Sequence, residues 1–202
     1  MTTLFFDIGS TLVDEGTAYD HHARMMLEGS GITFAEFDRK RREFYEKGMD
    51  GNSEAATFFG LPERPWPSED ELVFPDAAET LEYLRGRGYR LGIIANQPEG
   101  TERRLSERGL IRFFSVIEAS YECGFGKPDE RIFRKAASDA GCRMEDAWMI
   151  GDRLDNDILP ARRLGMKTVW IRSGMWKLTP LSFSDGIADL CINKLSELKL
   201  RF

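Results

Sequence analysis

Short apolar runs alternate with amphipathic segments along most of the chain. The apolar runs predict strands at 3–8, 90–95, 115–118, 147–150, 167–171 and 190–192. The amphipathic segments between and after them predict helices at 76–87, 100–108, 129–140, 157–164 and 194–200. Strands that alternate with helices of this kind form a parallel sheet that helices cover on both faces. The pattern therefore predicts an α/β fold.

Residues 14–74 interrupt this alternation, because helical spacing fills them and no strand is evident. Helices are expected at 18–28, 34–47 and 53–59. Ser53 is the expected N-cap of the last of these helices. The proline-rich stretch at 61–68 must be a loop. Since the interruption follows the first strand directly, we expect a small all-helical insert, with residues 1–13 and 75–202 forming the core.

One helix has a predicted inward face. In the segment 76–87, the spacing of apolar residues predicts that Ala78, Leu81, Tyr83 and Leu84 point toward the core. Asp129 opens the helix at 129–140 with an acidic first turn, and Gly141 ends it.

Composition narrows the class of partner. The 202 residues include 34 acidic and 28 basic side chains, for a net charge of −6, and 42% are hydrophobic. This is a globular composition, and it lacks the basic face that nucleic-acid binders normally present. The longest basic run, 39–42, is surrounded by acidic residues and reads as a solvated helix face. We therefore expect no nucleic-acid partner.

The sequence also bears on location. No segment reaches the roughly 18 consecutive apolar residues of a membrane span, and the first residues lack the features of a signal peptide. Cys123, Cys142 and Cys191 lie too far apart to suggest a zinc site or a disulfide framework, and we interpret them as reduced thiols. These observations predict a cytoplasmic protein without a membrane partner.

Polar residues follow the predicted strands where a parallel sheet binds ligands. Asp7 follows the first strand, Asn96 the second, and Asp152 and Asp157 follow the strand at 147–150, while Lys127 precedes a helix. The carboxyl ends of parallel strands lie at one edge of the sheet, so these groups should converge on one pocket. Carboxylates crowded together repel each other unless a cation lies between them. Oxygen ligands suit Mg²⁺, and the lysine could hold an anionic substrate.

Four segments, in this order, resemble the motifs of the haloacid dehalogenase (HAD) superfamily. They are Phe5-Phe6-Asp7-Ile8-Gly9-Ser10-Thr11-Leu12, Ile93-Ile94-Ala95-Asn96, Gly126-Lys127-Pro128-Asp129 with Ile132-Phe133, and Ile150-Gly151-Asp152-Arg153-Leu154-Asp155-Asn156-Asp157-Ile158. The resemblance implies a Rossmann-like three-layer core with a parallel sheet. The helical insert at 14–74 is similar to the cap of the helical-cap branch.

The resemblance also implies roles for individual residues. Asp7 would be the nucleophile that attacks phosphorus and becomes an aspartyl-phosphate. Asp7, the backbone carbonyl of Gly9 and Asp152 would hold Mg²⁺, with Asp157 binding directly or through water. Lys127 would pair with Asp7 and with the phosphoryl oxygens. On the same resemblance, two further residues are expected to bind substrate, namely Thr11 and Asn96.

The chain departs from the family pattern at two positions. Phosphatases of the family usually carry an aspartate two residues after the nucleophile, as general acid and then base, but this chain has Gly9. The second motif usually has a threonine or serine that binds phosphate, where this chain has Ala95. Loss of a general acid–base typically costs about 10²–10⁴ in rate. Asp14 or Glu15 could substitute, although both lie beyond the turn.

These features favour a Mg²⁺-dependent phosphohydrolase for a small phosphorylated metabolite, acting as a monomer or a homodimer. A degenerate HAD-fold protein that binds without turnover remains an alternative, because of Gly9 and Ala95. A phosphonate-cleaving enzyme would use Lys40 or Lys47 as a Schiff base, but both lie among charged residues. A dehalogenase would have a metal-free site, which the several carboxylates at the strand ends do not favour.

Overall fold

The chain divides into two compact units in the computed structural model, which describes every residue except the side chain of Ser184. The first unit comprises Met1–Val13, Val73–Ser173 and Ser184–Phe202, and the second comprises Asp14–Leu72 and Gly174–Phe183. Most of the second unit is the stretch that the sequence predicts as a helical insert. The segment Gly174–Phe183 also belongs to it, whereas the sequence analysis placed that segment in the core.

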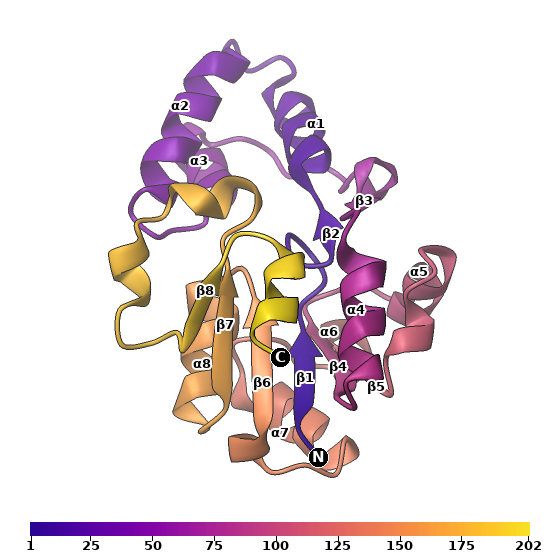
Figure 1. The fold of residues 1–202 in the computed structure, drawn as a ribbon. Helices are drawn as coiled ribbons and strands as arrows, with labels where there is room; N and C mark the ends of the chain where they lie inside the picture. Colours follow the sequence, from indigo (N-terminus) through magenta and orange to yellow (C-terminus); the bar gives the residue numbers. More distant parts are fainter. The chain divides into compact units, whose positions relative to one another are not determined.

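The first unit is built on a six-stranded parallel sheet with the strand order β5-β4-β1-β6-β7-β8 (Figure 1). The strands are β1 Thr3–Phe6, β4 Arg90–Ala95, β5 Val116–Ala119, β6 Ala147–Gly151, β7 Lys167–Ile171 and β8 Leu190–Ile192. Each lies within a segment that the apolar runs indicated or within one residue of it. The predicted α/β fold with a parallel sheet is confirmed.

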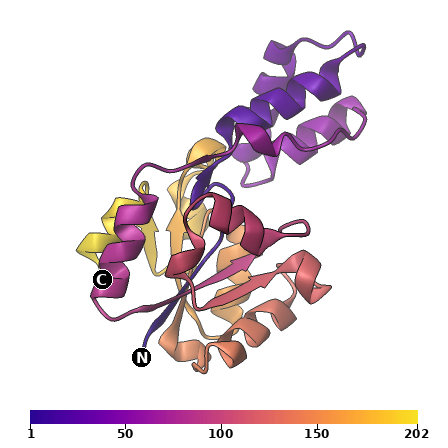
Figure 2. The ribbon, with the colours of Figure 1, turned by 90° about the vertical axis from the view of Figure 1, so that its right-hand side faces the viewer.

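Helices cover both faces of this sheet, as Figure 2 shows with the sheet seen close to its edge. They are α4 Ala77–Gly86, α5 Thr101–Glu107, α6 Ser120–Cys123, α7 Glu130–Asp139 and α8 Leu159–Arg163. Leu4 and Phe6 of β1 pack in the cluster with α4, while Phe5 packs in the cluster with α7. This alternation is the period of two that separates the faces of a strand.

The inward face of α4 differs from the predicted one. Ala78 and Tyr83 are exposed, and the buried positions are Ala77, Thr80, Leu81 and Leu84. These four follow the i, i+3, i+4, i+7 spacing of one helix face, which excludes the two exposed residues. The prediction for Ala78 and Tyr83 was wrong, because both lie outside the helix face that the four buried residues form.

The second unit contains three helices, α1 Gly16–Leu27, α2 Phe34–Tyr45 and α3 Gly51–Phe59. Asp50, not Ser53, is the N-cap of α3, and its carboxylate accepts a hydrogen bond from the Ser53 backbone N–H. At the two ends of the insert, β2 (Val13–Asp14) and β3 (Leu72–Val73) form a separate two-stranded sheet, which the sequence had not indicated.

The segment Gly174–Phe183 packs on α2. The ring of Trp176 meets that of Tyr45 edge to face, with 5.0 Å between centroids. The hydroxyl of Thr179, which is fully buried, donates a hydrogen bond of 2.8 Å to the carbonyl oxygen of Tyr45. Such contacts explain why this part of the chain belongs to the helical unit.

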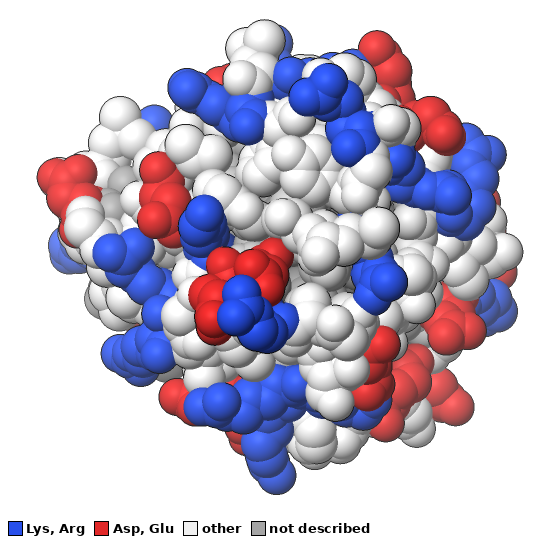
Figure 3. All heavy atoms as spheres, turned by 60° about the horizontal axis from the view of Figure 1, so that its bottom comes forward, with Lys and Arg blue, Asp and Glu red and all other residues white. Residues whose placement is uncertain are grey.

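The surface shown in Figure 3, which brings the lower part of Figure 1 forward, intersperses Lys and Arg with Asp and Glu. Neither sign of charge dominates this face. Among the described residues, no helix is long and apolar enough to cross a membrane.

Candidate active site

The central position of β1 determines where the polar groups meet. The chain runs from β1 to β4 on one side and later to β6 on the other, and such a reversal opens a crevice at the carboxyl ends of the strands. Asp7 follows β1, and its backbone N–H donates a 2.9 Å hydrogen bond to the carbonyl oxygen of Ile150 in β6. Asp152 follows β6, and its own carbonyl oxygen accepts a hydrogen bond from the indole of Trp170. Asp7 and Asp152 therefore directly follow the carboxyl ends of two neighbouring strands.

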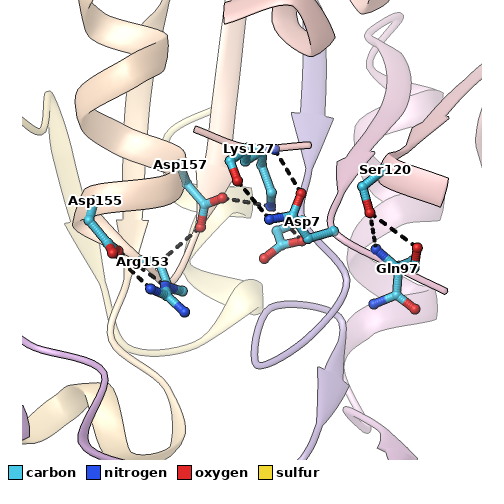
Figure 4. A network of polar contacts seen from close by, with 8 residues as sticks. Asp7, Gln97, Ser120, Lys127, Arg153, Asp155 and Asp157 are labelled. Atoms are coloured by element: carbon cyan, nitrogen blue, oxygen red, sulfur yellow. Dashed lines mark hydrogen bonds and ion pairs between the residues drawn. The ribbon is translucent and has the colours of Figure 1, made fainter. Parts of the chain in front are cut away.

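Lys127 bridges two of the aspartates (Figure 4). Its Nζ lies 2.7 Å from Oδ1 of Asp7 and 2.7 Å from Oδ1 of Asp157. The lysine side chain is only 2% exposed. Burial alone would lower the pKa of Lys127, but the charges of Asp157 and Asp7 and the hydrogen bonds to them raise it above its ordinary value. The lysine is therefore charged at neutral pH.

Asp157 is fully buried. Its Oδ2 accepts a 3.0 Å hydrogen bond from the backbone N–H of Arg153, at the start of a π-helical turn, Leu154–Ile158, that leads into α8. Burial raises the pKa of Asp157 to about 6; Lys127 opposes this rise, and the negative charge of Asp7 adds to it. This carboxyl therefore ionises at a higher pH than an ordinary aspartate.

The donor set suits a divalent cation. Asp7, Asp152 and Asp157 each offer a carboxylate oxygen, and these atoms lie within 4.8 Å of one another. When ionised, the three carboxylates carry two more negative charges than Lys127 balances. Hard oxygen ligands with excess negative charge are the environment that Mg²⁺ prefers. These residues therefore fit the Mg²⁺ that the sequence analysis expected.

Gly9 lies in the turn after Asp7 and forms a bridge to Val13. The positive φ in this turn falls on Ser10, at 50°. The hydroxyl of Ser173, beyond the end of β7, donates a hydrogen bond to the carbonyl oxygen of Ser10. No motif singles out Ser173, because its contact depends on how the end of β7 and this turn meet in the folded chain.

The two expected substrate-binding residues have different surroundings. The side-chain amide of Asn96 is engaged twice by Lys127: its Nδ2 donates to the lysine carbonyl oxygen at 2.8 Å, and its Oδ1 accepts from the lysine N–H at 2.7 Å. Thr11 is fully buried, and among the described residues its hydroxyl has no hydrogen-bond partner. The Thr11 hydroxyl thus bonds to none of the described residues, whereas Asn96 reaches the aspartates through Lys127.

Several supporting residues escaped the sequence analysis. Ser120 closes the loop after β4 through its Oγ, which accepts from the backbone N–H of Gln97 and donates to the carbonyl oxygen of the same residue. Arg153 holds Asp155 through two hydrogen bonds, of 3.1 and 2.7 Å. The available signal was a glycine directly before Lys127 and before Asp152, at residues 126 and 151, since a glycine can mark a close approach of another group.

Comparison with known proteins places this geometry in a family. The sequence model of haloacid dehalogenase-like hydrolases matches residues 1–165. The chain belongs to this hydrolase family. A protein named glyceraldehyde 3-phosphate phosphatase from Methanothermobacter thermautotrophicus is 38% identical over an alignment of 224 positions, which covers 98% of each chain. A protein of the same name from Methanopyrus kandleri is 36% identical over 126 residues, which cover 62% of this chain but only 54% of that protein.

A solved structure agrees with this assignment. The crystal structure of a HAD phosphatase from Thermococcus onnurineus superposes with a TM-score of 0.68 at 26% identity, and covers 100% of this chain and 97% of that one. The expected family membership is confirmed, and the chain is a HAD-like hydrolase.

Proposed function

We propose that this HAD-like hydrolase is a Mg²⁺-dependent phosphatase that acts on a small phosphorylated metabolite through an aspartyl-phosphate. The observation that carries the proposal is the bridge of Lys127 between Asp7 and Asp157, beside Asp152. Relatives named as phosphatases, two of which are given above, support the same reaction class.

Asp7 is the proposed nucleophile. A carboxylate oxygen of Asp7 attacks phosphorus, the bond between phosphorus and the leaving oxygen breaks, and the phosphoryl group is transferred to the aspartate. Water then attacks the same phosphorus and releases phosphate, which restores the carboxylate. Lys127 orients Asp7 through its bond to Oδ1 and places a positive charge where the phosphoryl oxygens carry negative charge.

Asp7, Asp152 and the carbonyl of Gly9 would hold Mg²⁺, with Asp157 as a direct or water-mediated fourth contact. The ion, when bound, would neutralise the carboxylates and stabilise the charge on the phosphoryl oxygens. Asp157 also accepts from Arg153 N–H and from Lys127, so this residue fixes both the lysine and the loop after β6.

The glycine at position 9 determines which leaving groups we expect to react fastest. With no side chain two residues after Asp7, the leaving oxygen receives no proton from that position. Aryl and acyl phosphates leave as weak bases and need little protonation, whereas alkyl phosphates leave as strongly basic alkoxides. We therefore expect activated phosphates to react faster than sugar phosphates, by part of the roughly 10²–10⁴ that a general acid supplies.

The second unit is proposed to act as a cap that selects the substrate and excludes water during the reaction. Glyceraldehyde 3-phosphate is the first substrate to try, because relatives are named for its hydrolysis. The test is a panel of phosphorylated metabolites and one aryl phosphate, each with and without Mg²⁺, with Asp7→Asn as the blank. Phosphate release that needs both Mg²⁺ and Asp7 is expected.

Gly9 and Ala95 favour a second candidate, a HAD-fold protein that binds Mg²⁺ and a phosphorylated ligand without turnover. The same panel separates the two candidates. Binding of phosphorylated ligands with no phosphate release, even from the aryl phosphate, would establish the second candidate in place of the first.

A further inference from the structure

We propose that Asn96 is a positioning residue that acts through Lys127, rather than a residue that contacts the substrate. The inference rests on the proposed function, because it assigns Asn96 to the geometry of the lysine that serves Asp7. It replaces the role expected from the sequence, in which the amide would meet the phosphoryl group.

The amide of Asn96 matches the peptide group of Lys127 at two points. Its Oδ1 accepts from the lysine N–H at 2.7 Å and its Nδ2 donates to the lysine carbonyl oxygen at 2.8 Å. A side-chain amide offers an acceptor oxygen and a donor nitrogen side by side, so it can satisfy both groups at once. The pair holds the backbone of Lys127 against the end of β4, because Asn96 is the first residue after that strand.

Gly126, the residue before the lysine, leaves room for the same amide. A Cβ on Gly126 would lie 2.5 Å from Oδ1 of Asn96 and 2.7 Å from Cβ of Ser120. A side chain at this position would displace the amide from the lysine. The absence of a side chain at residue 126 is therefore part of the same arrangement.

The contact between Asn96 and the Lys127 backbone affects the active site through the other end of the lysine, its Nζ. The Nζ of Lys127 makes two 2.7 Å contacts with Asp7 and Asp157, in a site that leaves the lysine side chain 2% exposed. A shift of its backbone would lengthen at least one of these contacts. Misplacement of a reacting group by about 1 Å can cost about 10² in rate, so Asn96 can affect catalysis without touching the substrate.

The first test measures the lysine directly. Acetylation of Lys127 by acetic anhydride is followed by mass spectrometry in the native protein, in Asn96→Ala and in Asn96→Asp. We expect slow acetylation in the native protein and a clear acceleration in Asn96→Ala. Asn96→Asp keeps the acceptor for the lysine N–H but sets a carboxylate oxygen against the lysine carbonyl, so an intermediate rate is expected. Asn193→Ala removes an exposed asparagine and is the matched control, with an unchanged rate.

The second test separates positioning from direct contact. With an aryl phosphate, we expect Asn96→Ala to lower kcat about 10²-fold and to leave KM little changed. In a Lys127→Met background, Asn96→Ala should have no further effect on the affinity for inorganic phosphate, since the two residues act as one unit. If Asn96→Ala does not fold, Asn96→Asp, which has nearly the same shape, serves for both tests.

Unchanged acetylation of Lys127 in Asn96→Ala, or a loss of phosphate affinity that persists without Lys127, would overturn the inference. Failure of the proposed function is distinguishable. Suppose that the native protein releases no phosphate from any substrate, yet Lys127 is acetylated faster in Asn96→Ala. That result would support the positioning of Lys127 by Asn96 and contradict the proposed phosphatase activity.

Discussion

Gly151 leaves the space that the carboxylate of Asp157 occupies. A Cβ on residue 151 would lie 2.3 Å from Oδ2 of Asp157 and 2.4 Å from its Cγ. No real side chain tolerates such distances, so Asp157 or the end of β6 would have to move. The glycine at the end of β6 thus allows a fully buried aspartate to reach Lys127 and to lie near the carboxylates of Asp7 and Asp152.

Gly151→Ala is therefore expected to damage the site as well as the fold. Overpacking of this kind typically costs about 1–3 kcal/mol of unfolding free energy, which urea denaturation would measure. The stabilisation by Mg²⁺ should also decrease, because Asp157 leaves its place. Gly86→Ala is the control: apart from its chain neighbours and the backbone of its own helix, no atom of the described residues lies within 4 Å of the added Cβ. The stability of this variant should be unchanged or slightly raised. Equal behaviour of the two variants would contradict the packing argument.

Mg²⁺ should stabilise the native protein. Free Mg²⁺ about 100-fold above its dissociation constant should add about 2.7 kcal/mol by linkage, seen as a higher melting temperature. Asp152→Ala should abolish the shift. A melting temperature that does not respond to millimolar Mg²⁺ would count against the site.

The Mg²⁺ effect should weaken in acid. The pKa of Asp157 is raised to about 6 in the metal-free protein, so this carboxyl holds a proton below that pH and is ionised above it. Metal binding requires the ionised form. The melting shift should therefore be smaller at about pH 5 than at about pH 7.5, and a shift that grows in acid would contradict the account.

The segment Gly174–Phe183 should contribute to the stability of the helical unit. Thr179→Val removes the buried hydrogen bond to the Tyr45 carbonyl, which still accepts one from the Gly48 backbone N–H. The expected cost is that of one hydrogen bond, about 0.5–1.5 kcal/mol of unfolding free energy. Thr17→Val, on an exposed position of α1, is the matched control and should change stability little. Urea unfolding of both variants checks this, and equal stabilities would show that the segment does not support the unit.

Much of the fold could be predicted from the sequence because buried parallel strands are short apolar runs between turn residues. The candidate site residues could be chosen once the strands were predicted, since each follows or flanks an element that ends at one edge of the sheet. Gly174–Phe183 could not be assigned, because its contacts with Tyr45 depend on the folded chain. The two hydrogen bonds between Asn96 and Lys127 could not be predicted either, since the residues are 31 positions apart and only the sheet order brings them together.

Gly9→Asp tests the missing acid. A carboxyl at this position should raise the rate on alkyl phosphates by up to about 10²–10⁴ and affect aryl phosphates far less. The ratio of kcat/KM for an alkyl and an aryl phosphate is the measurement. An equal gain for both, or none in a folded variant, would mean that the acid comes from elsewhere or that hydrolysis is not the task of this protein.

The central claim is that Asp7 becomes phosphorylated, and acid-quenched peptide mass spectrometry after incubation with an acyl phosphate and Mg²⁺ tests it most directly. Without an acid–base at Gly9, the intermediate should be cleared slowly and so accumulate. The account predicts one phosphoryl group on the peptide that contains Asp7, absent without Mg²⁺ and absent in Asp7→Asn. Phosphate release that proceeds at the native rate in Asp7→Asn, or a phosphoryl group on another residue, would contradict it.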